Sequence, residues 1–81
     1  MLQAGTHPQS LAQLASGQKG VVSAINGDAH FIGRITAIGL TVGCPVEILR
    51  NERRQPVLLY SRDTMIAMDK REGEKIMVKI T

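Results

Sequence analysis

Hydrophobic and polar side chains alternate through the second half of the chain in the way that half-buried β-strands require. Val46 and Ile48, for example, flank Glu47, so both apolar side chains face the same side of a strand. The segments with this alternation, or with apolar and β-branched runs of strand length, are 18–25, 46–48, 57–61, 64–68 and 76–80. The sequence therefore predicts five short strands.

A single segment has the period of an α-helix. Phe31, Ile35 and Ile38 fall on one stripe of a helix that is expected to span residues 29–38. Asp28 precedes it, and its carboxylate can accept a hydrogen bond from the free amides of the first turn. An internal glycine and several β-branched residues have low helix propensity, so packing against the strands has to stabilise this helix.

The N-terminal residues 1–9 (MLQAGTHPQ) have no apolar period and are expected to form a flexible tail. Ser10 follows and is expected to cap a helical turn at 11–15. A second helical turn or tight loop is expected at 69–74, where charged residues dominate. At 81 residues the chain has room for one domain, which we place at 10–81.

Five short strands, one helix and short connections are typical of a small antiparallel β-barrel, which pairs its edge strands and needs only a thin core. The predicted fold class is therefore mainly β, with one short α-helix between the first and second strands. Folding buries roughly 60% of the surface of so small a chain, which leaves little volume for a deep substrate cavity.

The composition excludes several classes of protein. Cys44 is the only cysteine, so the chain cannot form an intramolecular disulfide, which fits a reducing cytoplasm. No apolar run reaches the length of a membrane span and no signal sequence is visible, so neither membrane insertion nor export is expected. The net charge of +3 favours anionic partners.

The sequence lacks the residue patterns that catalysis and metal binding require. Nucleophilic catalysis requires an activated nucleophile beside a base, and the sequence has neither a Gly-x-Ser-x-Gly elbow nor a phosphate-binding loop. Asp28 and His30 lie two positions apart and do not converge on one helical face, while His7 and Cys44 have no partner at ligand spacing. We therefore predict no enzymatic activity, no metal site and no cofactor.

Nucleic acid is not the favoured partner, although the chain is basic. Small barrels that bind single strands use aromatic side chains as stacking platforms, and Phe31 and Tyr60 are the only aromatic residues. Phe31 belongs to the helical stripe, which leaves Tyr60 alone. The same scarcity argues against an aromatic groove for proline-rich peptides.

Several short pieces of the sequence are informative through their order. They are Leu11-x-x-Leu14-x-x-Gly17, Arg34, Gly39-Leu40-x-x-Gly43, the strand that starts at Pro56, Ile66-Ala67-Met68 and Ile76-x-Val78. In this order they resemble the FeoA family of ferrous iron transport accessory proteins, over residues 11–81. The resemblance implies a FeoA-type SH3-like barrel and a weak transition-metal contact at the level of the family. It also implies a cytoplasmic protein, peripheral at the inner membrane, beside a large membrane ferrous iron transporter with a G-protein domain.

The favoured function is therefore a non-catalytic regulatory module that binds this transporter. The alternative is a nucleic-acid-linked module, either an RNA-binding small barrel or a detached domain of the type found at the C-terminus of metal-dependent repressors.

The strands carry more apolar residues than one thin core can face, because either Leu58 and Tyr60 or Val57 and Leu59 have to point away from it. One interpretation is that the helix or the N-terminal turn covers the surplus. The other is an exposed strip for docking or self-association, with an arginine rim. The predicted strip consists of Leu49, Leu58, Tyr60 and Met77, with Arg50, Arg53 and Arg54 at its rim.

Overall fold

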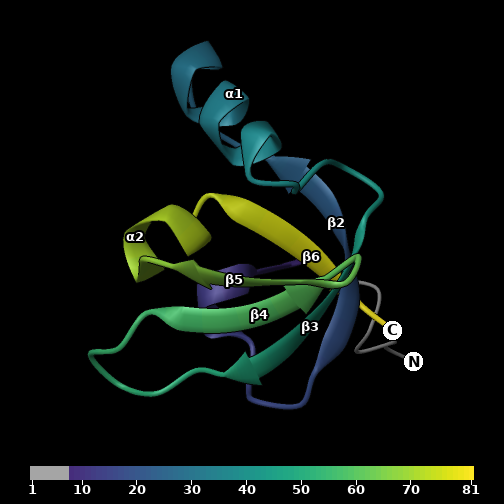
Figure 1. The fold of residues 1–81 in the computed structure, drawn as a ribbon, viewed down its shortest axis with the longest axis vertical. Helices are drawn as coiled ribbons and strands as arrows, with labels where there is room; N and C mark the ends of the chain where they lie inside the picture. The colour runs from purple at the N-terminus through teal and green to yellow at the C-terminus, as the bar shows by residue number, and fades with distance from the viewer. Residues whose placement is uncertain (1–7) are drawn as a thin grey trace.

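Six strands form one antiparallel sheet in the order β1-β6-β2-β3-β4-β5 (Figure 1), in a computed structural model that describes residues 8–81. The strands are β1 (Gln9–Ser10), β2 (Lys19–Ile25), β3 (Pro45–Arg50), β4 (Val57–Ser61), β5 (Thr64–Met68) and β6 (Ile76–Ile80). The helical segments are the 3-10 helix η2 (Leu11–Gln13) and the α-helices α1 (Ala29–Ala37) and α2 (Lys70–Gly73). The mainly β class and the five predicted strands are confirmed, with α1 between β2 and β3.

The strand β2 holds the two halves of the sheet together, because it pairs with β3 on one side and with β6 on the other. Gly20 is opposite a residue of each neighbour, Val46 and Ile80. A Cβ atom at Gly20 would lie 2.4 Å from the carbonyl oxygen of Lys79 and 2.5 Å from Cγ1 of Val78. Glycine is therefore required for β2 and β6 to approach this closely.

One core is filled by alternate residues of the strands together with residues from the helices and loops. Val57 and Leu59 point inward and Leu58 and Tyr60 outward, which decides the choice that the sequence left open for β4. The inward orientation predicted for β3 and β6 is confirmed, except that Ile80 is half-buried. The buried apolar residues are Leu11, Leu14, Val22, Phe31, Ile35, Leu40, Cys44, Val46, Ile48, Val57, Leu59, Ile66, Met68, Ile76 and Val78.

The sheet is not closed into a barrel by hydrogen bonds, so the predicted closure is not confirmed. Its edges are β1 and β5, and no ladder joins them within residues 8–81. One reason is that β1 has two residues and follows Pro8, which has no N–H to donate. Instead α2, which follows β5, packs on η2, which follows β1. A Cβ atom at Gly73 of α2 would lie 3.3 Å from the backbone nitrogen of Ala12.

The helix α1 begins where the sequence predicts and ends one residue earlier. The carboxylate of Asp28 accepts a hydrogen bond of 2.8 Å from the N–H of Phe31, which confirms the predicted cap. Phe31 and Ile35 are buried, but Ile38 is 42% exposed, so its predicted place in the buried stripe is wrong. Because the helical conformation stops at Ala37, Ile38 becomes the C-cap and is not held against the core. Within residues 8–81 no helix is long and apolar enough to cross a bilayer.

A charged contact joins α1 to α2. The guanidinium of Arg34 donates to the carboxylate of Glu72, and the two residues form an ion pair. The ammonium of Lys75 lies 4.7 Å from the ring centroid of Phe31, and the Arg34 guanidinium lies 5.9 Å from it. Both distances are within the range of cation–π attraction, and Lys75 thereby links α1 to the segment between α2 and β6.

The N-terminal segment differs from the prediction at two residues. Gln9 pairs with Val78 in β1 and so does not belong to a tail, while residues 1–7 of the predicted tail lie outside the described residues. The hydroxyl of Ser10 makes no capping bond to η2, so the predicted cap is wrong. Ser10 pairs instead with Met77 in the ladder, which leaves its hydroxyl buried without a hydrogen-bond partner.

Asn51 anchors the segment between η2 and β2 to the end of β3. Its side-chain amide donates to the carbonyl oxygens of Ala12 and Leu14 at 2.9 and 2.7 Å, and its backbone N–H donates to Oγ of Ser16 at 3.0 Å. Three hydrogen bonds from one residue thus satisfy groups more than thirty positions away in the chain.

Gly20→Ala is expected to lower the free energy of unfolding by about 2 kcal/mol or more, because the added Cβ clashes with the backbone of β6. The matched control is Gly33→Ala in α1, where a Cβ meets nothing within 4 Å. This control should raise the stability by about 0.5–1 kcal/mol, because alanine is the better helix former. Urea unfolding followed by circular dichroism measures both. An unchanged midpoint for Gly20→Ala would refute the close approach.

Asn51→Ala is expected to lower the free energy of unfolding by about 1–2 kcal/mol, because two carbonyl oxygens lose their donor. Asn51→Asp should be worse at neutral pH, since a carboxylate then faces those oxygens. Protonation of that carboxyl at low pH restores a donor, so the gap between this variant and the wild type should narrow on acidification. Asn26→Ala at an exposed turn is the control, with a change of less than about 0.5 kcal/mol. Equal effects at the two asparagines would contradict the anchoring role.

Candidate functional site

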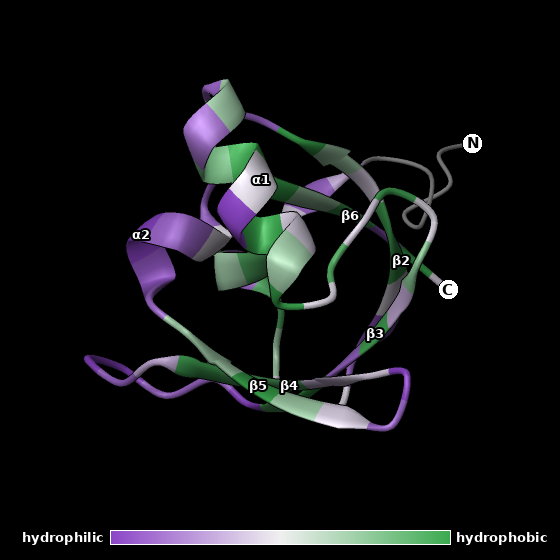
Figure 2. Cartoon of the chain, turned by 45° about the horizontal axis from the view of Figure 1, so that its top comes forward, coloured by the Kyte–Doolittle hydropathy of each residue, from purple (hydrophilic) through white to green (hydrophobic). Residues whose placement is uncertain are grey.

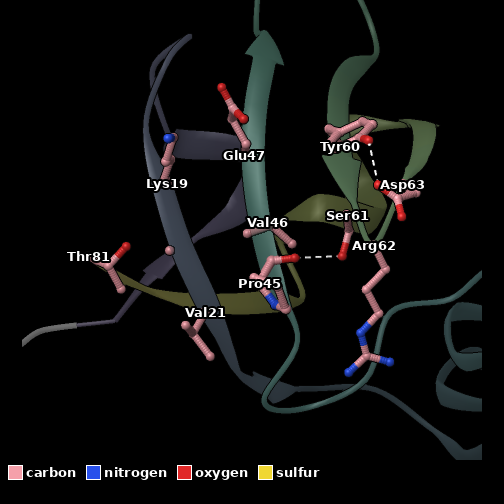
Figure 3. A pocket seen from close by; sticks show the side chains of 11 residues that line it. Lys19, Val21, Pro45, Val46, Glu47, Tyr60, Ser61, Arg62, Asp63 and Thr81 are labelled. Carbon is pink, nitrogen blue, oxygen red and sulfur yellow. Dashed lines mark hydrogen bonds between the residues drawn. The ribbon is translucent and has the colours of Figure 1, made fainter.

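An open groove of about 360 Å³ crosses the outer surface where β2, β3 and β4 lie side by side (Figure 3). Lys19 and Arg62 bring cations to it, and Glu47 and Asp63 bring carboxylates. The hydroxyl of Tyr60 donates to Oδ1 of Asp63 at 3.0 Å. The lining therefore offers charges of both signs beside one aromatic ring, a mixture that suits a polypeptide segment better than a single small ion.

The tight turn at one end of the groove is strained. Arg62 and Asp63 have φ angles of 51° and 65°, in the left-handed region that glycine and asparagine prefer. Such a two-residue turn matches the twist of the hairpin β4–β5, and the Tyr60–Asp63 hydrogen bond stabilises it. The Arg62 side chain of this turn lies at the rim of the groove, as Figure 3 shows.

A small polar network lies beneath the groove. The buried hydroxyl of Ser61 donates to the carbonyl oxygen of Pro45 at 2.5 Å (Figure 3). Because this hydrogen is already used, the thiol of Cys44 is the donor in its 3.5 Å contact with Oγ of Ser61. Cys44 is fully buried. It is thus a satisfied core residue that joins the start of β3 to the end of β4.

Six of the seven residues predicted for partner binding lie on the hairpin of β3 and β4. Leu49 and Arg50 are at the end of β3, where the register shifts by a bulge, and Leu49 is 39% exposed. The others on this hairpin are Arg53 and Arg54 in the connecting loop and Leu58 and Tyr60 on β4. Met77 lies apart on β6, which β2 and β3 separate from β4. The structure therefore does not bring Met77 into one strip with the rest.

The outer side of the β4–β5 hairpin carries apolar residues that sequence reasoning missed. Met65 is opposite Tyr60 and Ala67 is opposite Leu58 in the ladder. Met65 is 62% exposed and Tyr60 38%. We call Leu58, Tyr60, Met65 and Ala67 the β4–β5 face. The alternation of segment 64–68 could have revealed its two new members, since Ile66 and Met68 point inward.

Among residues 8–81 no group of three or more His, Cys, Asp or Glu side chains is placed to hold a metal ion. Asp28 caps α1, His30 is exposed on the first turn of that helix, and Cys44 is buried. His7 lies outside the described residues.

The open six-stranded sheet with its small helices defines a small domain of the SH3-like class. A family model described as the FeoA domain matches residues 9–80. The chain belongs to the FeoA family.

Solved structures share this fold. A crystal structure of an iron uptake regulatory protein, FeoA, has a TM-score of 0.88 and 23% identity, with 93% of this chain and 100% of that chain covered. The solution structure of iron(II) transport protein A from Clostridium thermocellum has a TM-score of 0.80 and 18% identity, with 90% and 46% covered. A manganese-dependent transcriptional repressor has a TM-score of 0.84 and 14% identity, with 91% and 42% covered. The chain thus spans less than half of the last two proteins. Among curated protein sequences, none matches this chain.

Native Cys44 is expected to react with iodoacetamide at least about a hundredfold more slowly than in the urea-unfolded protein, because its thiol is buried and bonded to Ser61. Mass spectrometry of timed samples measures the rate. Ser61→Ala, which removes the thiol's acceptor, should raise the native rate and leave the unfolded rate unchanged. Rapid labelling of the folded wild type would show that Cys44 is accessible and reopen its candidacy as a ligand.

Proposed function

We propose that this chain is a non-catalytic accessory protein of ferrous iron uptake that acts by binding a membrane iron(II) transporter from the cytoplasmic side. Membership of the FeoA family is the observation that carries this proposal. Two proteins of the same fold are described as an iron uptake regulatory protein and as an iron(II) transport protein. Two of the titratable groups that sequence reasoning considered for chemistry have structural roles, since Asp28 caps α1 and Cys44 is buried.

The β4–β5 face is the surface that we propose for this contact. Met65 and Tyr60 are adjacent and exposed, and Leu58 and Ala67 continue the apolar surface along the same two strands. Exposed apolar patches with polar rims mark interaction sites, and tyrosine is a frequent anchor in them. The groove beside Tyr60 adds Lys19, Glu47 and Arg62, which can pair with charged groups of the partner. Apolar burial then contributes affinity, while the charges select the orientation.

Met65→Asp is expected to weaken retention of the transporter's cytoplasmic part by at least about tenfold, because it puts a charge into the apolar contact. The matched control is Val42→Asp, since Val42 is 61% exposed and Met65 is 62% exposed, but Val42 lies in the loop before β3. This control should bind like the wild type. Pull-down from solubilised membranes and titration with the purified cytoplasmic part give the two measurements.

Unfolding midpoints of both variants should stay close to that of the wild type, because both positions are exposed. Equal binding by Met65→Asp and wild type would exclude the β4–β5 face as the contact. If the wild type fails to bind the transporter, the proposed function itself is wrong. Conversion of a wild-type dimer to a monomer by Met65→Asp would instead assign the face to self-association, and salt-resistant retention of RNA would favour the nucleic-acid alternative.

A further inference from the structure

The positive charge of the molecule is concentrated at one end. Five of its ten cationic side chains lie in the β3–β4 loop region and in α2, together with three carboxylates, Glu52, Asp69 and Glu72. The other five cationic side chains are accompanied by four carboxylates elsewhere, so two of the three net positive charges belong to this end. We call it the basic end; its cations are Arg50, Arg53, Arg54, Lys70 and Arg71.

Contacts between the loop and α2 make the basic end one surface. The ammonium of Lys70 donates to the carbonyl oxygen of Glu52. A depression between the two elements is lined by Arg54 and Pro56 from the loop and by Asp69 and Lys70. Figure 2 shows the loop joining β3 to β4 and the helix α2 as strongly hydrophilic segments on the same side of the molecule.

The cations of the basic end are not neutralised within the described residues. The one ion pair within residues 8–81 joins Glu72 to Arg34 of α1, which lies outside the basic end. Of the other two local carboxylates, Asp69 accepts a hydrogen bond of 3.2 Å from the N–H of Arg71 as the cap of α2, and Glu52 forms no ion pair. An external anionic partner can therefore meet these cations without breaking an internal pair.

Aliphatic side chains lie directly beside these cations. Leu49 is 39% exposed next to Arg50, and Leu58, opposite Arg50 in the ladder, is half-buried. Pro56 and Leu58 line a second depression together with Arg50. The aromatic residues Phe31 and Tyr60 lie outside this end, so it lacks the stacking platforms that single-stranded nucleic acids need.

We propose that the basic end binds the anionic surface of a lipid bilayer. Arginine and lysine beside exposed aliphatic groups is the composition of interfacial membrane-binding segments, in which the cations meet headgroup phosphates and the aliphatic groups enter the outer edge of the acyl region. This contact adjoins the β4–β5 face at Leu58 and needs no protein partner. It would orient the domain at the membrane with Tyr60, Met65 and the groove beside them free.

The contact is electrostatic, so its strength has a defined dependence on charge and salt. Each cation near an anionic bilayer contributes roughly fivefold to the partition coefficient. Raising the ionic strength from about 0.1 M to 1 M shortens the Debye length from about 10 Å to 3 Å and should release the protein. One such patch gives reversible binding, in contrast to the insertion of a membrane-spanning helix.

Sedimentation with vesicles tests this contact on the purified chain. Vesicles of phosphatidylcholine with about one third phosphatidylglycerol should bind the wild type at low salt, and phosphatidylcholine alone should not. The triple variant Arg50→Gln, Arg53→Gln, Arg54→Gln should bind roughly a hundredfold more weakly. The matched control is Lys19→Gln, Arg62→Gln, Lys79→Gln, which removes the same net charge from exposed positions outside the basic end. It should lose less than about fivefold.

A second readout uses the absence of tryptophan from the chain. Leu49→Trp should show a blue-shifted emission on the anionic vesicles, whereas Val42→Trp, at an exposed position outside the basic end, should show none. Equal losses in the two triple variants, or shifts at both tryptophans, would show that net charge alone drives binding and overturn the assignment. Retention by poly-glutamate under conditions that leave the vesicles unbound would assign the basic end to an acidic protein and also overturn it.

Discussion

The close approach of β2 and β6 at Gly20 is the constraint on which the remainder of the fold depends. Without it β2 could not pair with β3 and β6 at the same position, and the sheet would divide into the β1–β6 pair and the β3–β4–β5 meander. The core residues Val22 and Val78, which are opposite each other in the same ladder, are placed by this pairing. The lack of a side chain at Gly20 thus determines the register of the central strand β2, and this register determines which residues face the core.

The same alternation that fills the core also produces the exposed β4–β5 face. The sheet is thin, so one set of side chains on β4 and β5, including Leu59 and Ile66, completes the interior. The other set points outward, and in the described residues no helix covers Met65 or Tyr60, since η2 and α2 occupy the gap between β5 and β1. The β4–β5 hairpin thus carries apolar residues on both of its faces, but only one face packs on the core. The apolar residues of the other face are therefore exposed. Proteins usually avoid exposed apolar strand surfaces because these surfaces promote aggregation. The exposed β4–β5 face therefore supports the proposal that a partner covers it.

The cationic side chains are also distributed unevenly over the molecule. The β3–β4 loop region and α2 carry two of the three net positive charges of the molecule. These two elements meet because α2 packs on η2, and Asn51 holds η2 and the segment after it to the end of β3. Packing between segments distant in sequence thus assembles the basic end. The arrangement thus puts an apolar surface, the β4–β5 face, next to a cationic one, the basic end, and the two meet at Leu58.

Features that depend on neighbours along the chain could be predicted from the amino-acid pattern. These include the cap at Asp28, the strand alternation around Glu47 and the resemblance to the FeoA family, because caps and strand periods involve residues only a few positions apart. Other features became evident in the folded chain alone: Met77 lies apart from Leu58, Gln9 pairs with Val78, and Asn51 donates a hydrogen bond to Ala12. Strand order, open sheet edges and long-range hydrogen bonds depend on how the whole chain packs around its core. Many strand arrangements are compatible with the same local pattern of apolar and polar residues. Core packing and the need to hydrogen-bond buried backbone groups select one of them.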